Sequence, residues 1–253
     1  MRAQFLFVFL HFFRLDKPFL TGYNDAMNKD ELLLTPIAYI ENDFKEKFGI
    51  PRQSGRAPSL LSKIVFLPKY ATEDAFRGLD GFSHLWLIFD FSKAHKTDFS
   101  PTVRPPRLGG NERVGVFASR SPFRPNPLGL SVVRLENIET ENGKVILLVS
   151  GADLLDGTPI FDVKPYLPFA DAVENAKDGY AGKTENYRLT VDFPKPLLDK
   201  IPKEKRAGLI ECLADDPRPS YQDDPTRAYG MRFGQFNVRF KVENGVLTVT
   251  EIE

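Results

Sequence analysis

The sequence predicts a mainly β protein, with a closed or nearly closed antiparallel barrel followed by a smaller α+β unit. Short apolar segments recur at near-regular spacing between residues 32 and 163, and Gly and Pro separate them. Almost no helical periodicity lies between these segments, which argues against alternating strand and helix units. With 42% hydrophobic and 27% charged residues among 253, the composition is that of a globular protein.

The expected elements follow in order along the chain. Strands are expected at 32–40, 60–67, 82–91, 114–118, 130–137, 145–150 and 160–163. A short helix is expected at 72–77, with Thr72 as its N-cap and Gly78 as its stop. The segment 82–91 is continuously apolar and aromatic, which predicts a strand buried on both faces. Asn142-Gly143 predicts a hairpin turn.

A second unit follows a polar stretch at 173–186, which has few apolar residues and is typical of a linker or surface loop. Beyond it we expect an apolar segment at 187–193, a helix from about 196 to 213 and a hairpin at 236–252 turned at Asn244-Gly245. The predicted domains are therefore the barrel at 28–175 and an α+β domain at 176–253.

The first 26 residues contain the apolar run MRAQFLFVFLHFF, which is too short to span a bilayer. His11 interrupts the run and no small-x-small cleavage site follows before Asp16, so the segment fits a secretory signal poorly. We favour the interpretation that residues 1–27 are an N-terminal extension from an over-long gene assignment, with translation starting at Met27. A signal or anchor peptide is the alternative.

Composition and motifs exclude several classes of function. The net charge is zero, so bulk charge does not indicate a nucleic-acid partner, and any such partner must be recognised by local clusters. The single cysteine, Cys212, excludes an internal disulfide and fits a cytoplasmic protein. No dinucleotide, P-loop or nucleophile-elbow motif occurs. The three histidines lack ligand spacing, so no metal site is expected, and His84 is interpreted as a core or interface residue.

The stretch 104–131 has the most unusual composition of the chain, with five Arg, five Pro, four Gly and no Lys. Proline and glycine at this density exclude a continuous helix or interior strand across the stretch. Arginine offers a planar fork of donors suited to phosphates, carboxylates and stacked bases. The stretch therefore predicts a rigid, arginine-lined loop that holds a charged ligand.

Two further clusters accompany this loop. A Pro-fixed turn at 51–53 presents Arg52 and Gln53 together, although a plain polar loop is the alternative. Asp153 and Asp156 follow the strand expected at 145–150 and are suited to the ribose or amino group of a ligand, although Asp-Gly and Thr-Pro pairs are also typical of simple turns.

These residues carry a resemblance to a known family. The chain resembles the TrmO family of tRNA methyltransferases in PRQ at 51–53, GFSHLWLIFDF at 81–91, RPPRLGG at 104–110, VFASRSPFRPNPLGLS at 116–131 and DLLDGTPIFDVKPYLP at 153–168. DPRPSYQ at 216–222 is similar to the C-terminal domain of bacterial members. The resemblance covers the chain in order from residue 33 to residue 240.

The resemblance implies methyl transfer from S-adenosylmethionine to the exocyclic N6 nitrogen of N-threonylcarbamoyladenosine, 3′ of the anticodon of certain tRNAs. It also implies a cytoplasmic homodimer with a single-sheeted β-barrel, without membrane or metal. Carried over by position, the methyl donor would be bound by Pro51, Arg52, Gln53, Ser92, Lys93, Arg120, Leu130, Asp153, Leu154, Leu155 and Asp156. Relatives often have His at the position of Ser92, so contact there is expected through the backbone.

Catalytic and RNA-binding roles are hypotheses built on that resemblance. Asn126, held between two prolines, is expected to accept a hydrogen bond from the target N–H, by analogy with the Asn-Pro motifs of adenine amino-methyltransferases. Tyr166 is expected to stack on the base, as Phe123 also could. Phosphate contacts are expected from Arg104, Arg107, Arg113 and Arg124.

A function of another class is a non-catalytic RNA-binding or ligand-sensing β-barrel that keeps the arginine loop but has lost methyl transfer. The intact turn at 51–53 and the paired aspartates argue against it.

Overall fold

The computed structural model describes residues 32–108, 112–142, 144–219, 221, 222 and 224–253, and the expected extension at 1–27 lies outside these residues. The strands are β1 (Ala38–Glu41), β2 (Leu61–Phe66), β3 (His84–Asp90), β4 (Thr102–Val103), β5 (Val114–Gly115), β6 (Leu128–Glu141), β7 (Lys144–Ser150), β8 (Pro159–Pro165), β9 (Thr190–Asp192), β10 (Tyr229–Phe233), β11 (Phe236–Glu243) and β12 (Val246–Ile252). The α-helices are α1 (Pro168–Asp171), α2 (Lys195–Leu198) and α3 (Lys203–Ala214).

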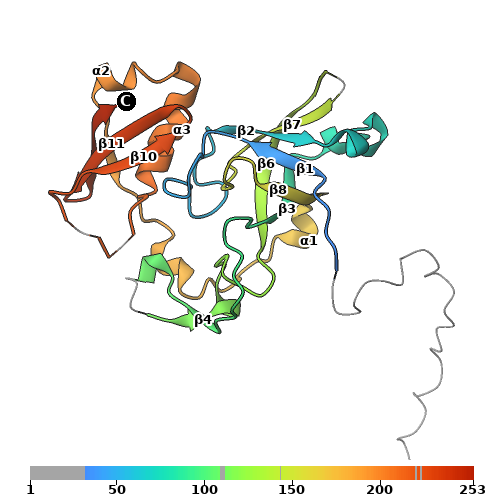
Figure 1. The fold of residues 1–253 in the computed structure, drawn as a ribbon, viewed down its shortest axis with the longest axis horizontal. Coiled ribbons are helices and arrows are strands. Elements are labelled where there is room, and N and C mark those ends of the chain that lie inside the picture. Colours follow the sequence, from blue (N-terminus) through green and yellow to red (C-terminus); the bar gives the residue numbers. More distant parts are fainter. Residues whose placement is uncertain (1–31, 109–111, 143, 220, 223) are drawn as a thin grey trace, which may run out of the picture. The chain divides into compact units, whose positions relative to one another are not determined.

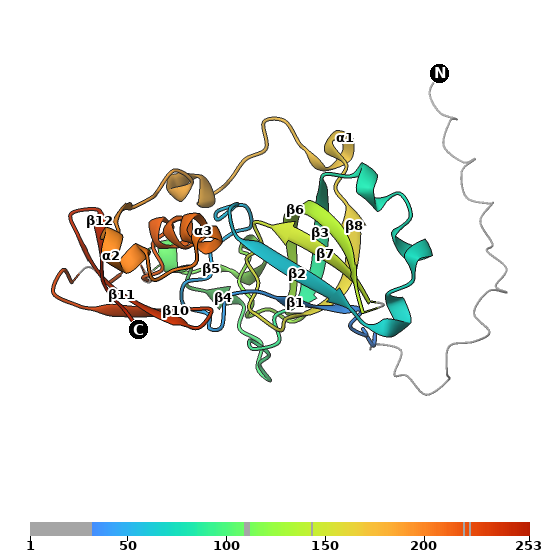
Figure 2. The same ribbon diagram turned by 90° about the horizontal axis from the view of Figure 1, so that it is seen from above.

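Six strands pair in the order β1-β2-β7-β6-β3-β8, and β8 pairs with β1 to close the sheet into a barrel (Figures 1 and 2). Every pairing in this circuit is antiparallel. The strand β3 lies between β6 and β8, with Leu87 opposite Ser131 on one side and Val163 on the other. A mainly β fold, as expected from the spacing of the apolar segments, is therefore confirmed.

The remaining long strands form a second, four-stranded sheet in the order β10-β11-β12-β9, with α3 beside it (Figure 1). The hairpin expected at Asn244-Gly245 is confirmed, since both residues have positive φ, 50° and 77°, and join β11 to β12. The strand β9 runs parallel to β12. The strands β4 and β5, each two residues long, form a separate two-stranded ribbon.

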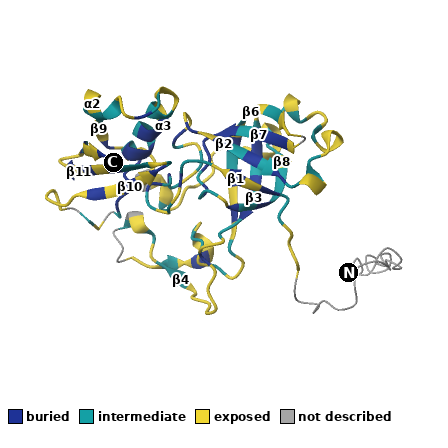
Figure 3. Cartoon of the chain, turned by 45° about the horizontal axis from the view of Figure 1, so that its top comes forward, coloured by how far each residue is buried: buried dark blue, intermediate teal, exposed yellow. Residues whose placement is uncertain are grey.

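Two clusters of buried apolar side chains hold the structure together, and Figure 3 shows buried residues in both sheets. One fills the barrel and includes Ile64, Leu85 and Leu147, all fully buried. The other lies between the second sheet and α3, and it takes in side chains from the loop that joins β1 to β2. By their contacts, residues Thr35–Glu253 form one compact unit, so the domain boundary at 175 stays a prediction.

Several predicted elements differ from the structure for local reasons. The helix expected at 196–213 is divided into α2 and α3, because Pro202 stands directly before α3 and disfavours helical geometry in the residue preceding it. The segment Val116–Ala118 is a 3-10 turn that ends the short strand β5. The segment Glu73–Phe76 is likewise a 3-10 turn and not an α-helix. The strand β10 was not predicted.

The prediction that strand 82–91 is buried on both faces is wrong. Side chains of β3 alternate between fully buried and half-buried. Leu85 and Leu87 point into the barrel, whereas Trp86 lies half-exposed on the outside. Its indole N–H donates to Asp171 at 3.0 Å, which accounts for an apolar residue on the outer face. Among the described residues, no helix combines the length and apolar character needed to cross a membrane.

Candidate functional site

A cavity of about 830 Å³ opens at one end of the barrel. Its walls come from the end of β3 and the residues that follow it to Ala94, and from the start of β6 and the residues that precede it from Ser119. The turn at 51–53 and the loop at 153–155 complete the walls. Small-molecule sites are typically concave spaces of a few hundred to about 1,000 Å³ lined by apolar groups with a few fixed polar ones. The size and position of this cavity fit a ligand of that class.

The donor-binding residues expected from the resemblance gather around this cavity with one exception. Those that line it are Pro51, Arg52, Gln53, Ser92, Lys93, Arg120, Leu130, Asp153, Leu154 and Leu155. They come from four separate parts of the chain, and the barrel brings them together because β3 and β6 are neighbours and begin or end at the same rim. Asn126 also lines the cavity.

Two of the clusters singled out in the sequence are joined directly across the cavity. The guanidinium of Arg120 donates to the side-chain oxygen of Gln53 at 2.6 Å. Arg120 is exposed, so the rest of its planar fork faces solvent or a ligand. The site therefore offers a cation whose orientation is fixed from the opposite loop.

Among the described residues, Asp153 is one of the two carboxylates that line the cavity, and the other is Asp90, which pairs with His95. The Oδ1 of Asp153 accepts a hydrogen bond of 2.6 Å from the hydroxyl of Ser131 on β6. Burial raises the pKa of Asp153 above its ordinary value, and the bond from Ser131 and the charge of Arg120 oppose that shift. A ligand that brings hydroxyl or ammonium donors would satisfy this carboxylate.

The rim of the cavity carries exposed apolar side chains. Phe123, Leu128 and Leu130 are 42%, 40% and 55% exposed. Between the two leucines, Gly129 points inward against the ring of Phe89 on β3, where a Cβ would lie 2.1 Å from the ring carbon Cζ. Glycine is required here because the aromatic ring occupies the space of its missing side chain. Apolar atoms and a few fixed charges thus surround the same space.

Asp156 is the exception among the expected donor-binding residues, since it does not line the cavity. Its carboxylate pairs with Lys45 at 2.6 Å and accepts from the backbone N–H of Asn42 at 2.9 Å. The Asp-Gly turn directs this side chain toward the β1–β2 loop, where Lys45 and Asn42 satisfy its carboxylate.

Tyr166 lies at the opposite end of the barrel from the cavity. Its backbone N–H donates to the carbonyl of His84 at the first residue of β3, whereas the cavity adjoins the last residues of that strand. Seven residues of strand span about 20 Å at ~3.3 Å per residue. The ring packs against those of His84 and Trp86, with centroids 6.3 and 5.8 Å away. Tyr166 and Asn126 therefore do not share one site within a single chain.

The arginines expected to contact RNA divide into two groups. Arg124 lines the cavity and donates to the carbonyl of Ser119 at 3.2 Å. Arg104 and Arg113 are exposed at the end of the β4–β5 ribbon, and Arg113 donates to the hydroxyl of Thr102 at 3.0 Å. Arg107 lies in the turn Pro106–Leu108, and its side chain is outside the described set.

Several cavity residues escaped the sequence analysis, notably Lys47, Phe89, Phe91, Leu128 and Ser131. The strand period was an available signal for two of them. Once Leu130 is placed on β6, alternation puts Leu128 on the same outer face. Ser131 follows as an inward neighbour. Within the described ranges, no group of three or more His, Cys, Asp and Glu side chains is arranged to hold a metal ion.

Comparisons with known proteins point to one family along the whole folded chain. The profile of the tRNA-methyltransferase O N-terminal domain matches residues 39–172, and that of the TrmO C-terminal domain matches residues 186–253. The first match covers the barrel and every residue assigned to the cavity. The second covers the four-stranded sheet and its helices.

Similar proteins carry names that agree with these profiles. The chain is 40% identical over 225 residues to "tRNA (adenine(37)-N6)-methyltransferase" of Escherichia coli, covering 86% of this chain and 96% of that protein. It is 43% identical to "Putative S-adenosylmethionine-dependent methyltransferase RcsF" of Pseudomonas aeruginosa, covering 82% of this chain and 91% of that protein. "Crystal structure of TrmO from Pseudomonas aeruginosa" superposes with a TM-score of 0.71 at 36% identity, covering 88% and 99% of the two chains.

Proposed function

The chain belongs to the TrmO family of tRNA methyltransferases, and from this membership we propose that it transfers a methyl group from S-adenosylmethionine to N6 of adenosine 37 in tRNA. The observation that carries the proposal is the cavity of about 830 Å³, which unites the turn at 51–53, Arg120 and Asp153 at one rim of the barrel. We assign this cavity to the methyl donor.

The polar groups present fit that donor. Its carboxylate needs a fork of N–H donors, and Arg120, held by Gln53, presents one. Its ammonium and ribose hydroxyls need an acceptor, and Asp153 supplies it. The positive sulfonium requires surroundings that do not bury a second unpaired cation, and the apolar side chains of Phe89 and Leu130 meet that need.

We propose as the nucleophile the ureido N6–H of N-threonylcarbamoyladenosine, positioned by Asn126. S-adenosylmethionine, when bound, supplies an electrophilic methyl group on a sulfonium. Asn126 lines the cavity, and its side chain hydrogen-bonds to none of the other described residues. It is therefore available to accept the N6 proton in a hydrogen bond and to direct the nitrogen lone pair along the S–CH₃ axis. The N–C bond forms as the S–C bond breaks, the sulfur keeps the electron pair, and the proton passes to water.

We propose that the anticodon loop is held by arginines on two elements. Arg124 stands at the cavity, and the exposed Arg104 and Arg113 flank the β4–β5 ribbon. Contacts of this kind with phosphates weaken as salt rises, because each one releases counterions. The chain has no net charge, so this local cluster supplies the electrostatic attraction.

A homodimer completes the proposal. Exposed Phe123, Leu128 and Leu130 form an apolar rim beside the cavity, which a second subunit would cover. Because Tyr166 lies at the far end of its own barrel, a role for it in base stacking requires that it reach the cavity of a second copy. We place this dimer in the cytoplasm, where its tRNA substrate is found, and we propose that residues 176–253 fold as an α+β domain.

The test is methylation of defined tRNA by the purified protein. Radiolabelled S-adenosylmethionine is supplied with a tRNA that has adenosine at position 37, one sample carrying N-threonylcarbamoyladenosine and the other lacking only that modification. Nucleoside mass spectrometry is expected to find the methylated threonylcarbamoyl nucleoside in the first sample alone. Equal methylation of both would refute the threonylcarbamoyl substrate, and methylation of neither would refute the enzymatic function.

A further inference from the structure

The loop that carries the turn at 51–53 leaves the barrel after β1 and packs into the core of the second sheet. Phe44, Ala57 and Leu60 are buried in that core. At Gly49, where φ is +95°, a Cβ would lie 2.3 Å from the sulfur of Met231 on β10. The loop and the second sheet thus approach as closely as backbone and side chain allow.

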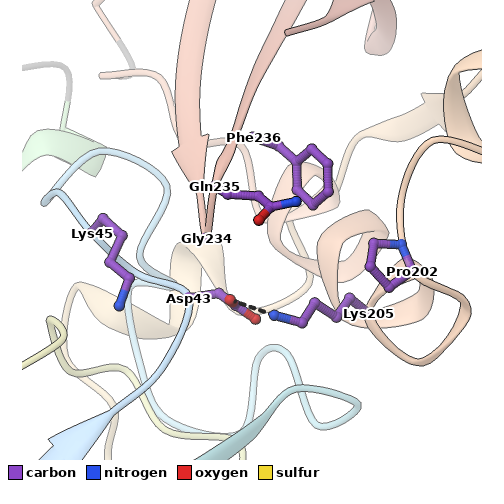
Figure 4. Close-up of a pocket in the computed structure, with 7 residues that line it drawn as sticks. All are labelled: Asp43, Lys45, Pro202, Lys205, Gly234, Gln235 and Phe236. Carbon is purple, nitrogen blue, oxygen red and sulfur yellow. Dashed lines mark hydrogen bonds and ion pairs between the residues drawn. The ribbon is translucent and has the colours of Figure 1, made fainter.

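Polar contacts fasten the start of this loop. Figure 4 shows Asp43, at the start of this loop, with its carboxylate directed toward Lys205 in a small cavity of about 400 Å³. Its carboxylate pairs with Lys205 of α3 at 2.7 Å, and its carbonyl accepts from the backbone N–H of Gly234 at 2.8 Å. The carboxylate of Glu46 accepts from the N–H of Arg232 at 2.9 Å.

The turn itself is held by Asp215, at the end of α3. One carboxylate oxygen of Asp215 accepts the backbone N–H of Arg52 at 3.1 Å, and the other accepts Nε of Arg56 at 2.6 Å. The guanidinium of Arg52 donates to the carbonyl of Arg218 at 3.1 Å. A residue that lines the cavity therefore has both its backbone and its side chain bound to the segment 215–218.

Asp215 is itself held in place by further contacts. It is 3% exposed, and its backbone N–H donates to the carbonyl of Glu211 at 3.1 Å in the last turn of α3. The next residue, Asp216, has φ of +53° and pairs with the buried guanidinium of Arg218 at 2.9 Å. Buried charges with several partners hold a single geometry, since a change of geometry would leave a buried charged group without a partner.

We propose that Asp215 is a positioning residue for the methyl donor: it acts from outside the cavity by fixing the turn at 51–53, so that Gln53 meets Arg120. This proposal rests on the proposed function, because it presumes that the cavity takes S-adenosylmethionine. Asp215 does not line the cavity, and its bond to the backbone of Arg52 is its link to Gln53 and Arg120.

The test compares donor affinity in three variants of the full-length protein by calorimetry with S-adenosylmethionine. Asp215→Asn keeps the size of the side chain and one acceptor but loses its charge, and Asp215→Ala loses all of its contacts. Val249→Ala, in the same core on β12, serves as the stability control, because Val249 is buried in that core and does not line the cavity. Melting temperatures are measured for all variants.

We expect Asp215→Asn to weaken donor binding on the order of tenfold, the loss of roughly one charge-assisted hydrogen bond. The KM for the donor is expected to rise in parallel, with kcat at saturating donor within about twofold of wild type. Asp215→Ala weakens binding further. Val249→Ala lowers the melting temperature and leaves donor affinity unchanged.

Unchanged donor affinity in both Asp215 variants would overturn the proposal, as would a loss in Val249→Ala as large as that in Asp215→Asn at a similar melting temperature. The wild-type protein is measured first. If it binds no S-adenosylmethionine, the proposed function fails, and that result is distinct from a wild-type level of binding in the variants.

Discussion

The guanidinium of Arg120 and the side-chain oxygen of Gln53 meet at 2.6 Å across 67 positions of sequence. This bond joins the arginine-rich loop to the turn at 51–53, and it leaves the remaining N–H groups of an exposed guanidinium directed away from Gln53. A planar fork can bind Gln53 and a donor carboxylate together, whereas a lysine ammonium offers only a point charge.

Arg120→Lys is expected to weaken S-adenosylmethionine binding on the order of tenfold, since the charge is retained and the bidentate geometry is lost. Calorimetry measures the affinity. Arg134→Lys, on the outer face of β6, is the matched control and is expected to bind as wild type. Wild-type affinity in Arg120→Lys would contradict the assignment of the donor carboxylate.

Asn126→Ala is expected to lower kcat by about 100-fold or more and to change donor affinity by less than about threefold, because the side chain orients the nucleophile and does not hold the donor. Single-turnover methylation and calorimetry separate the two quantities. Asn237→Ala, on β11, removes an amide bound to Glu253 far along the chain and is expected to keep full turnover. A loss confined to donor affinity would exclude the proposed role.

Asp153→Asn is expected to raise stability and reduce donor binding. Burial raises the pKa of Asp153, so keeping it ionised at neutral pH costs the folded state free energy. The cost decreases as the pH falls below the raised pKa of the folded state. It is gone below the ordinary pKa of an aspartate in the unfolded chain, about 4. The gain in melting temperature should therefore be largest near pH 7 and vanish in acid.

Asp156→Asn provides the contrast, because its carboxylate is paired with Lys45. At neutral pH this variant should lose stability, by up to about 1 kcal/mol for a half-exposed ion pair. Thermal unfolding from pH 4 to pH 8 measures both variants. A lower melting temperature for Asp153→Asn at pH 7 would show that the ionised carboxylate stabilises the folded state, contrary to this expectation.

Gly129→Ala is expected to destabilise the barrel by about 1–3 kcal/mol, because the added methyl group meets the ring of Phe89. If the ring moves away from it, the ring enters the cavity and donor affinity falls. Gly115→Ala is the control, since a Cβ there meets nothing within 4 Å. Denaturant unfolding of the two variants checks this, and equal stabilities would count against the close packing at the rim.

Cys212 is expected to resist thiol reagents in the folded protein. It is 1% exposed, and burial raises the pKa of its thiol, with the carboxylates of Asp215 and Glu211 adding to the effect. Labelling with a disulfide reagent at pH 8 should be at least about 100-fold slower than in the unfolded chain. Labelling at the unfolded rate would mean that the core around α3 is open.

The sequence was sufficient for the class of fold and for most of the cavity. Apolar segments with Gly and Pro between them predicted the strands, since closely spaced short strands leave no room for helices. The residues of the cavity were found through the resemblance, and β3 and β6 place them at one rim. The break between α2 and α3 was also readable, because Pro202 disfavours helical geometry in the residue before it.

Other features required the structure. Asp153 and Asp156 are three residues apart, yet only Asp153 lines the cavity, because Asp156 lies in the turn that follows and pairs with Lys45. Tyr166 follows a strand whose other end adjoins the cavity, so strand length alone separates it from Asn126. The bond from Arg52 to Asp215 spans 163 positions, and no local pattern in the sequence encodes a contact at that range.

The burial of the β1–β2 loop in the second core has a consequence for biosynthesis. Phe44, Phe48 and Ile50 are translated early, but the side chains that cover them, such as Leu209 and Phe240, emerge last from the ribosome. Until then the nascent barrel exposes three large apolar groups to chaperones and to other chains. Premature termination within the final strands would therefore yield an aggregation-prone product.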